Sequence, residues 1–368
     1  MLEMGSIHNY NTVHGQRHLV RYRKPDGAHA ARRGFLSRAD AVEYLALIDT
    51  AIARGTYVDP TTGRVTVEEL ATDWLAFQAA VLKPSTVHGL NSAWRVHVAP
   101  AWGHVRIDEI LHGHVRAWIT ELAAATGPST VIRAHGVLAG ILDVAVRDRR
   151  LADNPARGIR LPRKTPARRP YLADEQVELL AGHARHPALV YTLAYTGLRW
   201  GEAIALRVRD VDRHRRRLHV QENAVTVNGR IHVGSPKTHR TRSVAYPSFL
   251  VSQIDAVVVG KLPDMLLFGT GREYLPRPSS QAGWFASAVR HAQTEDPAFP
   301  RVTPHDLRHT AAALAIRAGA NVKAVQRMLG HASAVMTLDT YAHLFEDDLD
   351  TIAHAMNHAH AESTRSTP

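Results

Sequence analysis

The sequence predicts a mainly helical protein of several domains, with small β-sheets near the N-terminus and in the last third of the chain. Three observations support this fold class. The length of 368 residues suits two or three domains of roughly 150 residues. Turn-rich and proline-rich stretches divide the chain, and most segments between them repeat their apolar residues at helical spacing.

Residues 1–60 are expected to form a β-sheet followed by one helix. The expected elements are strands at 6–13, 18–23 and 28–35 and a helix at 38–54. Ser37 and Asp40 form a capping pair for this helix, and Gly55 supplies a left-handed end. The basic residues on the strands are Arg17, Arg21, Arg23, Lys24, Arg32 and Arg33. A basic sheet can lie along a nucleic-acid groove, although an ordinary solvated face explains the same charge.

Residues 64–160 are predicted to form a four-helix unit that ends at Asn154-Pro155. The predicted helices are 67–80, 85–97, 112–125 and 129–149, with breaks at Pro84, Pro100 and Gly127-Pro128. Residues 161–170 then place four basic residues among three prolines. We interpret this stretch as an extended linker that can track phosphates, with a plain spacer as the alternative.

Residues 171–368 are predicted to be mostly helical with one β-insertion. The expected strands are 217–222, 230–234 and 242–246. Asn228-Gly229 is a tight-turn dipeptide between the first two of them. The predicted fold therefore combines a sheet-plus-helix module, a four-helix domain and a mixed, mainly helical domain.

The composition favours a polyanion as the partner. Lysine and arginine number 45 against 34 aspartates and glutamates, giving a net charge of +11 and a pI near 10.2. No stretch has the ~20 uninterrupted apolar residues of a membrane helix, so no membrane partner is expected. The chain has no cysteine, which excludes disulfides, thiolate metal sites and cysteine nucleophiles and indicates an intracellular protein.

The last region contains a set of residues suited to a phosphodiester. Arg199 stands where Gly197 breaks a helix, Lys237 lies at an expected tip between strands, and His331 follows the helix stop at Gly330. Thr303 and Asp306 are expected to cap a helix that places His305 and Arg308 on one face near its N-terminus, where an anion is favoured. The remaining member of the set is Tyr341.

Together these residues match a metal-free site for phosphoryl transfer. Two arginines can grip the non-bridging oxygens of one phosphate and stabilise the charge of a pentacoordinate transition state. A lysine can donate a proton to the departing 5′ oxygen. A tyrosine hydroxyl, with an ordinary pKa near 10, needs a base or a cationic field to attack at neutral pH, and we expect His305 to accept its proton.

This region resembles the tyrosine recombinase family, the phage-type integrases in particular. The resemblance lies in five ordered motifs, TGLRWGEA, PKTHR, HDLRHT, LGHAS and TLDTYAHLF. It is strong from about Tyr171 to Phe345, moderate over the helical region before it, and weaker over the N-terminal module. The residues that it places at catalytic positions are Arg199, Lys237, His305, Arg308, His331 and Tyr341.

The resemblance implies a DNA-cutting and rejoining enzyme. Tyr341 would attack the scissile phosphate to give a 3′ phosphotyrosine and a free 5′ hydroxyl, without ATP, metal or another cofactor. Four protomers on two duplexes would exchange strands through a Holliday junction, and residues 347–357 would dock on a neighbour. Residues 1–60 would bind arm sites, 64–160 core sites, and 171–368 would be catalytic. A host DNA-bending protein and a directionality factor are further partners of such enzymes, whose expected location is the cytoplasm, on the nucleoid.

Other readings remain open. The chain could be a DNA-binding regulator with an idle site, or a type IB topoisomerase that relaxes DNA as a monomer. Glu202, three residues after Arg199, fits a structural salt bridge better than a catalytic role. His305 and His309 have zinc-ligand spacing, but the glutamate of a metallopeptidase motif is missing from its place after the first histidine.

Overall fold

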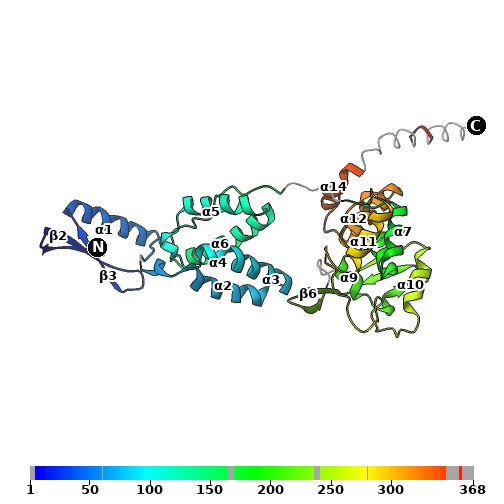
Figure 1. The fold of residues 1–368 in the computed structure, drawn as a ribbon. Helices are drawn as coiled ribbons and strands as arrows, with labels where there is room; N and C mark the ends of the chain where they lie inside the picture. The colour runs from blue at the N-terminus through cyan, green and yellow to red at the C-terminus, as the bar shows by residue number, and fades with distance from the viewer. Residues whose placement is uncertain are drawn as a thin grey trace, which may run out of the picture. The chain divides into compact units, whose positions relative to one another are not determined.

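The computed structural model describes residues 5–59, 61–164, 170–235, 241–279, 281–344 and 356–358. The chain divides into two compact units, Met1–Thr165 and Pro166–Pro368. Both are mainly helical and both contain small antiparallel sheets (Figure 1). The predicted site residue Lys237, most of the 347–357 segment and residues 165–169 of the predicted linker lie outside the described residues.

The first unit begins with a three-stranded antiparallel sheet covered on one face by a helix (Figure 1). Its elements are β1 (Gly5–Thr12), β2 (Gly15–Arg23), β3 (His29–Phe35) and α1 (Arg38–Ala53). The capping pair predicted at the start of α1 is present, because Ser37 and Asp40 each accept a hydrogen bond from the other's backbone N–H. Val20 and Tyr22 of β2 pack with Ala41 of α1 in a small buried core.

Four longer helices follow in the same unit. They are α2 (Val67–Val81), α3 (Pro84–Ala93), α5 (His112–Ala125) and α6 (Pro128–Arg147). Two 3-10 turns, η1 (Thr62–Arg64) and η3 (Ile107–Glu109), flank α2 and α5. The predicted break at Pro100 is wrong: α3 continues through a π-helical turn, η2 (Trp94–Val98), into α4 (Ala99–Trp102). Pro100 is tolerated because it lies in the first turn of α4, where a missing N–H costs little.

Helix α6 is the centre of this helical core. By length and composition it is the one helix in the described part of the chain that could cross a membrane, and half of its apolar window is buried inside the protein. Val131, Leu138, Ile141 and Leu142 are fully buried against the neighbouring helices. The apolar face of α6 is therefore used for packing within the unit.

The second unit surrounds a larger core with helices and a β-insertion. Its helices are α7 (Asp174–His183), α8 (Pro187–Thr196), α9 (Trp200–Ala205), α10 (Leu250–Val258), α11 (Trp284–Glu295), α12 (Asp306–Arg317), α13 (Val322–Leu329) and α14 (Ala334–Tyr341), with 3-10 turns η4 (Val208–Asp210) and η5 (Ala342–Leu344). Its strands are β4 (Val211–Asp212), β5 (Arg217–Val220), β6 (Asn223–Val227), β7 (Arg230–Gly234) and β8 (Arg242–Ala245).

The β-insertion differs in part from the prediction. The strands form two small antiparallel sheets, ordered β4-β5-β8 and β6-β7, and β4 and β6 were not expected from the sequence. The tight turn at Asn228-Gly229 is confirmed, since both residues have positive φ values, 51° and 75°. The strand at 230–234 pairs with β6 across this turn.

Helix α8 is buried in the second unit and positions the residues at its C-terminal end. Eight of its ten residues are buried, and the helix packs along α12. Leu172 donates its backbone N–H to the hydroxyl of Thr310 on α12, which fixes the start of this unit to the same helix. The residues at the ends of α8 and α12 are thereby held in a defined arrangement.

Candidate active site

Arg199 lies at the turn between two helices, as predicted. Gly197 ends α8 with a left-handed φ of 65°, and Arg199 is the N-cap of α9. Its backbone N–H and its Nη1 each donate a hydrogen bond of 2.9 Å to the carboxylate of Glu202. The structural salt bridge predicted for Glu202 is therefore confirmed, and it orients the guanidinium of Arg199.

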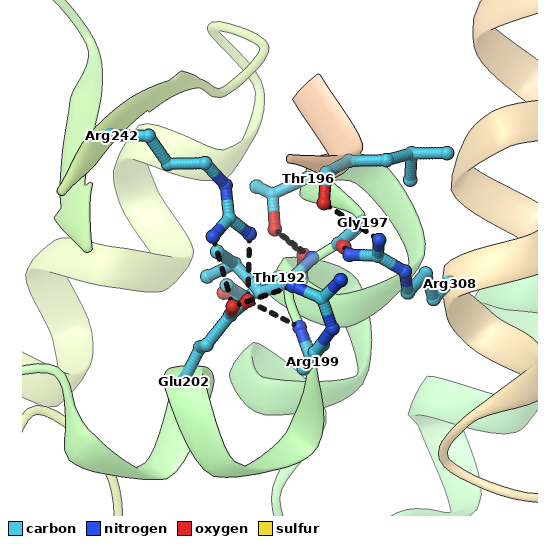
Figure 2. Close-up of polar contacts among 9 residues, drawn as sticks. Thr192, Thr196, Gly197, Arg199, Glu202, Arg242 and Arg308 are labelled. Atoms are coloured by element: carbon cyan, nitrogen blue, oxygen red, sulfur yellow. Dashed lines mark hydrogen bonds and ion pairs between the residues drawn. The ribbon is translucent and has the colours of Figure 1, made fainter. Parts of the chain in front are cut away.

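Arg242 binds the same carboxylate from β8. Its Nη1 and Nη2 donate to the two oxygens of Glu202 at 2.9 and 2.6 Å, so Glu202 lies between two guanidiniums (Figure 2). The Glu202 side chain is buried, and burial by itself raises a carboxyl pKa. The hydrogen bonds and charge of Arg242 and of Arg199 outweigh this effect and lower the pKa of Glu202 to about 2.

Arg308 joins the ends of two helices. Its Nη1 donates to the carbonyl of Gly197 (Figure 2) and its Nη2 to the carbonyl of Leu329, both at 2.6 Å. These carbonyls stand at the C-terminal ends of α8 and α13, where the helix dipole favours a cation. Burial, followed by repulsion from Arg199, lowers the pKa of Arg308 to about 9, so it stays positive at neutral pH.

The start of α12 differs from the prediction. The helix begins at Asp306 with His305 as its N-cap, because the backbone N–H and hydroxyl of Thr303 both donate to Asp306 and close a turn before the helix. His305 is exposed while Arg308 is buried, so the two side chains do not share one environment.

His331 follows the left-handed Gly330 that ends α13, as predicted. Its Nδ1 lies 3.0 Å from the hydroxyl of Thr337 on α14, which fixes the ring. Burial, then the charges of Arg308 and Arg199, lower the pKa of His331 to about 4. The imidazole is therefore neutral at pH 7.

Tyr341 lies at the end of α14 and is 4% exposed. It packs in a small core with Ala312 and Ile316 of α12 and Val325 and Leu329 of α13. Burial raises the pKa of its hydroxyl to about 12, and the charge of Arg308 opposes this rise. The predicted proton acceptor was His305, but the hydroxyl bonds to Nδ1 of His309 at 2.8 Å.

The structure brings most of the predicted set together. Arg199, Arg308 and His331 act on one another electrostatically, and Arg308 also acts on Tyr341. His305 contacts this group through His309, with ring centroids 5.5 Å apart. Among the described residues, no group of three or more His, Cys, Asp or Glu side chains is arranged to hold a metal ion.

Two residues of the site were not assigned from the sequence. Arg242 begins the strand expected at 242–246, and a strand position gives no sign of a partner on a helix elsewhere in the chain. His309 was weighed as a zinc ligand because it stands four residues after His305. Its hydrogen bond to Tyr341 depends on how α12 and α14 pack, and short-range spacing does not encode that contact.

Comparison with known proteins identifies the class. The model of the phage integrase family matches residues 172–348, and that of the phage integrase central domain matches residues 67–161. The integrase of Mycobacterium phage FRAT1 is 30% identical over 286 residues, which cover 74% of this chain and 83% of that protein. The chain belongs to the phage integrase family. It is a site-specific tyrosine recombinase, an enzyme that cleaves and rejoins DNA.

Solved structures share the fold. The integrase of the Tn1549 transposon, solved with transposon right end DNA, has a TM-score of 0.65 at 21% identity, over 83% of this chain and 100% of that one. A lambda integrase tetramer bound to a Holliday junction has a TM-score of 0.55 at 17% identity, over 89% of this chain and 96% of that one. The multidomain, mainly helical architecture is thus that of integrases.

Proposed function

We propose that the protein recombines DNA at specific sites through a 3′-phosphotyrosine at Tyr341, and so integrates or excises a mobile element. One observation carries this proposal. The Tyr341 hydroxyl, at the end of α14, lies in the field of Arg308, whose guanidinium joins the ends of α8 and α13 beside Arg199 and His331. Residues far apart in the sequence thus bring positive charge close to a buried hydroxyl.

The arginines are suited to grip the scissile phosphate. A guanidinium has five N–H donors. Arg308 uses its Nη1 and Nη2 on carbonyls and Arg199 uses Nη1 on Glu202, so each retains donors for phosphate oxygens. Charge that develops in the transition state would meet donors that are already oriented. Glu202 and Arg242 would hold Arg199 in place.

The remaining positions follow from the family resemblance. Lys237 would donate a proton to the departing 5′ oxygen, and His305 and His331 would complete the six catalytic positions. Because the phosphodiester energy is kept in the tyrosine link, the reaction needs neither ATP nor a divalent ion. We propose that no cofactor takes part.

The DNA partner would be held by both units. Residues 64–160 would bind the core site, residues 161–170 would follow the backbone, and residues 171–368 would cut. A tetramer would assemble on two duplexes, as lambda integrase does on a Holliday junction. A DNA-bending protein and a directionality factor would assist, and the protein would act on the nucleoid in the cytoplasm.

Residues 1–60 would bind separate arm sites through the open face of the sheet. Alternation along β2 places Arg17, Arg21 and Arg23 on one face, and Arg33 of β3 pairs with Leu19 on that face. Val20 and Tyr22 face α1 instead. Three of these four arginines are exposed, and the fourth, Arg17, is partly exposed. Strands with such a face can enter a DNA groove.

Strand exchange between two marked duplexes tests the proposal against its alternatives. The substrates would be built from DNA that flanks the coding region, with different end labels. We expect hybrid products of predicted length, formed in excess chelator. Relaxation of supercoiled DNA without hybrid products would indicate a type IB topoisomerase, and binding without cleavage would indicate an idle regulator.

A further inference from the structure

The hydroxyl of Tyr341 is held by a residue outside the six positions that the family resemblance assigns. His309 stands on α12, directly after Arg308, and its Nδ1 lies 2.8 Å from the tyrosine oxygen. The two rings are 5.6 Å apart between centroids. This contact ties the end of α14 to the first turns of α12.

The position of the hydroxyl creates a need for a base. A phenol buried among Ala312, Ile316, Val325 and Leu329 does not ionise readily at neutral pH, even with the charge of Arg308 nearby. General base catalysis requires an acceptor within hydrogen-bond reach of the proton that it removes. The Nδ1 atom of His309 meets that geometric requirement in the DNA-free protein.

We propose that His309 is the proton acceptor for Tyr341 during DNA cleavage, an inference that rests on the proposed role of Tyr341 as the nucleophile. The phenolic oxygen forms a bond to phosphorus while its proton passes to Nδ1 of a His309 ring protonated at Nε2. The bond from phosphorus to the 5′ oxygen breaks, and that oxygen takes a proton from the Lys237 ammonium. Rejoining returns both protons.

The surroundings of His309 suit a proton that is held briefly. It is flanked by His305, the N-cap of α12, and by Arg308, and across from it stand Tyr341 on α14 and His331 after α13. The titratable residues of α8, which packs on α12, are engaged elsewhere, since the hydroxyls of Tyr191 and Tyr195 bind Glu178 and Asp174. A bound phosphate would bring the negative charge that offsets an imidazolium at this place.

The test is the pH dependence of single-turnover cleavage in the full-length protein. The substrate is a nicked duplex that traps the covalent adduct. His309→Asn leaves an acceptor oxygen near the hydroxyl but no base, and His309→Gln is the second variant. His291→Asn, on the exposed surface of α11, is the matched control, and Tyr341→Phe sets the zero level. DNA binding and thermal unfolding are measured for every variant.

We expect both His309 variants to cleave roughly 10²- to 10⁴-fold more slowly than wild type at neutral pH, with DNA binding unchanged. The wild-type rate should level off once the imidazole is neutral, whereas the variant rates should keep rising as tyrosinate forms. The ratio of the wild-type rate to the variant rate should therefore fall about tenfold per pH unit. A substrate with sulfur in place of the 5′ bridging oxygen, whose leaving thiolate needs no acid, should rescue Lys237→Ala and not His309→Asn.

Two outcomes overturn the inference. If the His309 variants cleave at the wild-type rate at every pH, His309 takes no part in proton transfer. A loss of equal size at every pH would make it a purely structural contact. Failure of wild type itself to form an adduct would instead overturn the proposed role of Tyr341.

Discussion

Arg242 holds the buried carboxylate of Glu202 with two hydrogen bonds, at 2.9 and 2.6 Å. The same carboxylate accepts from the backbone and the guanidinium of Arg199. Glu202 thus links β8, a strand of the β-insertion, to the N-terminus of α9. Its negative charge also offsets part of the repulsion among the arginines of the site.

Removing one member of this cluster should be costly. Glu202→Gln and Arg242→Met should each destabilise the second unit by about 3–5 kcal/mol, because each removes one partner of the buried Arg242–Glu202 pair and leaves the other without it. The double variant should be destabilised by less than the sum of the two, since neither charge is then left without its partner. Urea unfolding of the three variants measures this coupling, and additive losses would show that the two side chains are independent.

Stability should depend on pH through Glu202. Its pKa of 4.5 in an unfolded chain falls to about 2 in the folded protein. A lowered carboxyl pKa stabilises the fold fully above 4.5, and this contribution disappears as the pH falls toward 2. It amounts to about 3 kcal/mol. The unfolding free energy of Glu202→Gln should therefore decline less between these pH values than that of wild type, and equal declines would contradict the assignment.

His331 should titrate far below an ordinary histidine. Its pKa is lowered from 6.5 to about 4, so the unfolded chain binds a proton first and stability falls as the pH drops through this range. NMR of labelled histidines should show His331 neutral at pH 6. Binding of core-site DNA should raise its pKa, because a phosphate opposes the field of Arg308 and Arg199. If the pKa of His331 does not change when DNA binds, the phosphate does not lie beside His331.

Arg308→Lys should impair the rate more than DNA affinity. A lysine cannot donate hydrogen bonds to both the Gly197 and the Leu329 carbonyl and also bind two oxygens of a phosphate. We expect cleavage to fall by a factor of about 100 or more, as when one oxyanion donor is removed, while affinity changes little. Single-turnover cleavage and a binding titration separate the two effects. Near-normal cleavage would reject the two-point grip.

The open face of the N-terminal sheet should contribute to the salt dependence of DNA binding. Replacing Arg21, Arg23 and Arg33 by alanine should flatten the plot of log affinity against log salt by about 0.9 for each phosphate that is no longer neutralised. Arg38→Ala with Arg54→Ala, at the start of α1 and at its C-cap, is the control. If both sets change the slope equally, the sheet face has no special role.

Local signals predicted much of this fold. The capping pair at Ser37 and the left-handed stops at Gly197 and Gly330 are present, because each depends on residues within one turn. The break at Gly197 likewise marked the turn at which Arg199 lies.

Long-range contacts were beyond such reasoning. The helix continues past Pro100 because a π-helical turn places the proline at a tolerant position, which spacing does not reveal. His305 was predicted as the partner of the Tyr341 hydroxyl. Because α12 begins at Asp306, His309 is the histidine on this helix that faces the hydroxyl. Arg242 reaches Glu202 only through the packing of β8 near α9.

Mapping the covalent adduct tests the central claim most directly. Wild-type protein is incubated in excess chelator with a nicked duplex that traps the cleaved intermediate, then denatured and digested, and the DNA-linked peptide is sequenced. We predict a denaturation-resistant adduct with the 3′ phosphate on Tyr341, and its loss in Tyr341→Phe while DNA affinity stays nearly unchanged. An adduct on another residue, or one that persists in Tyr341→Phe, would contradict the account.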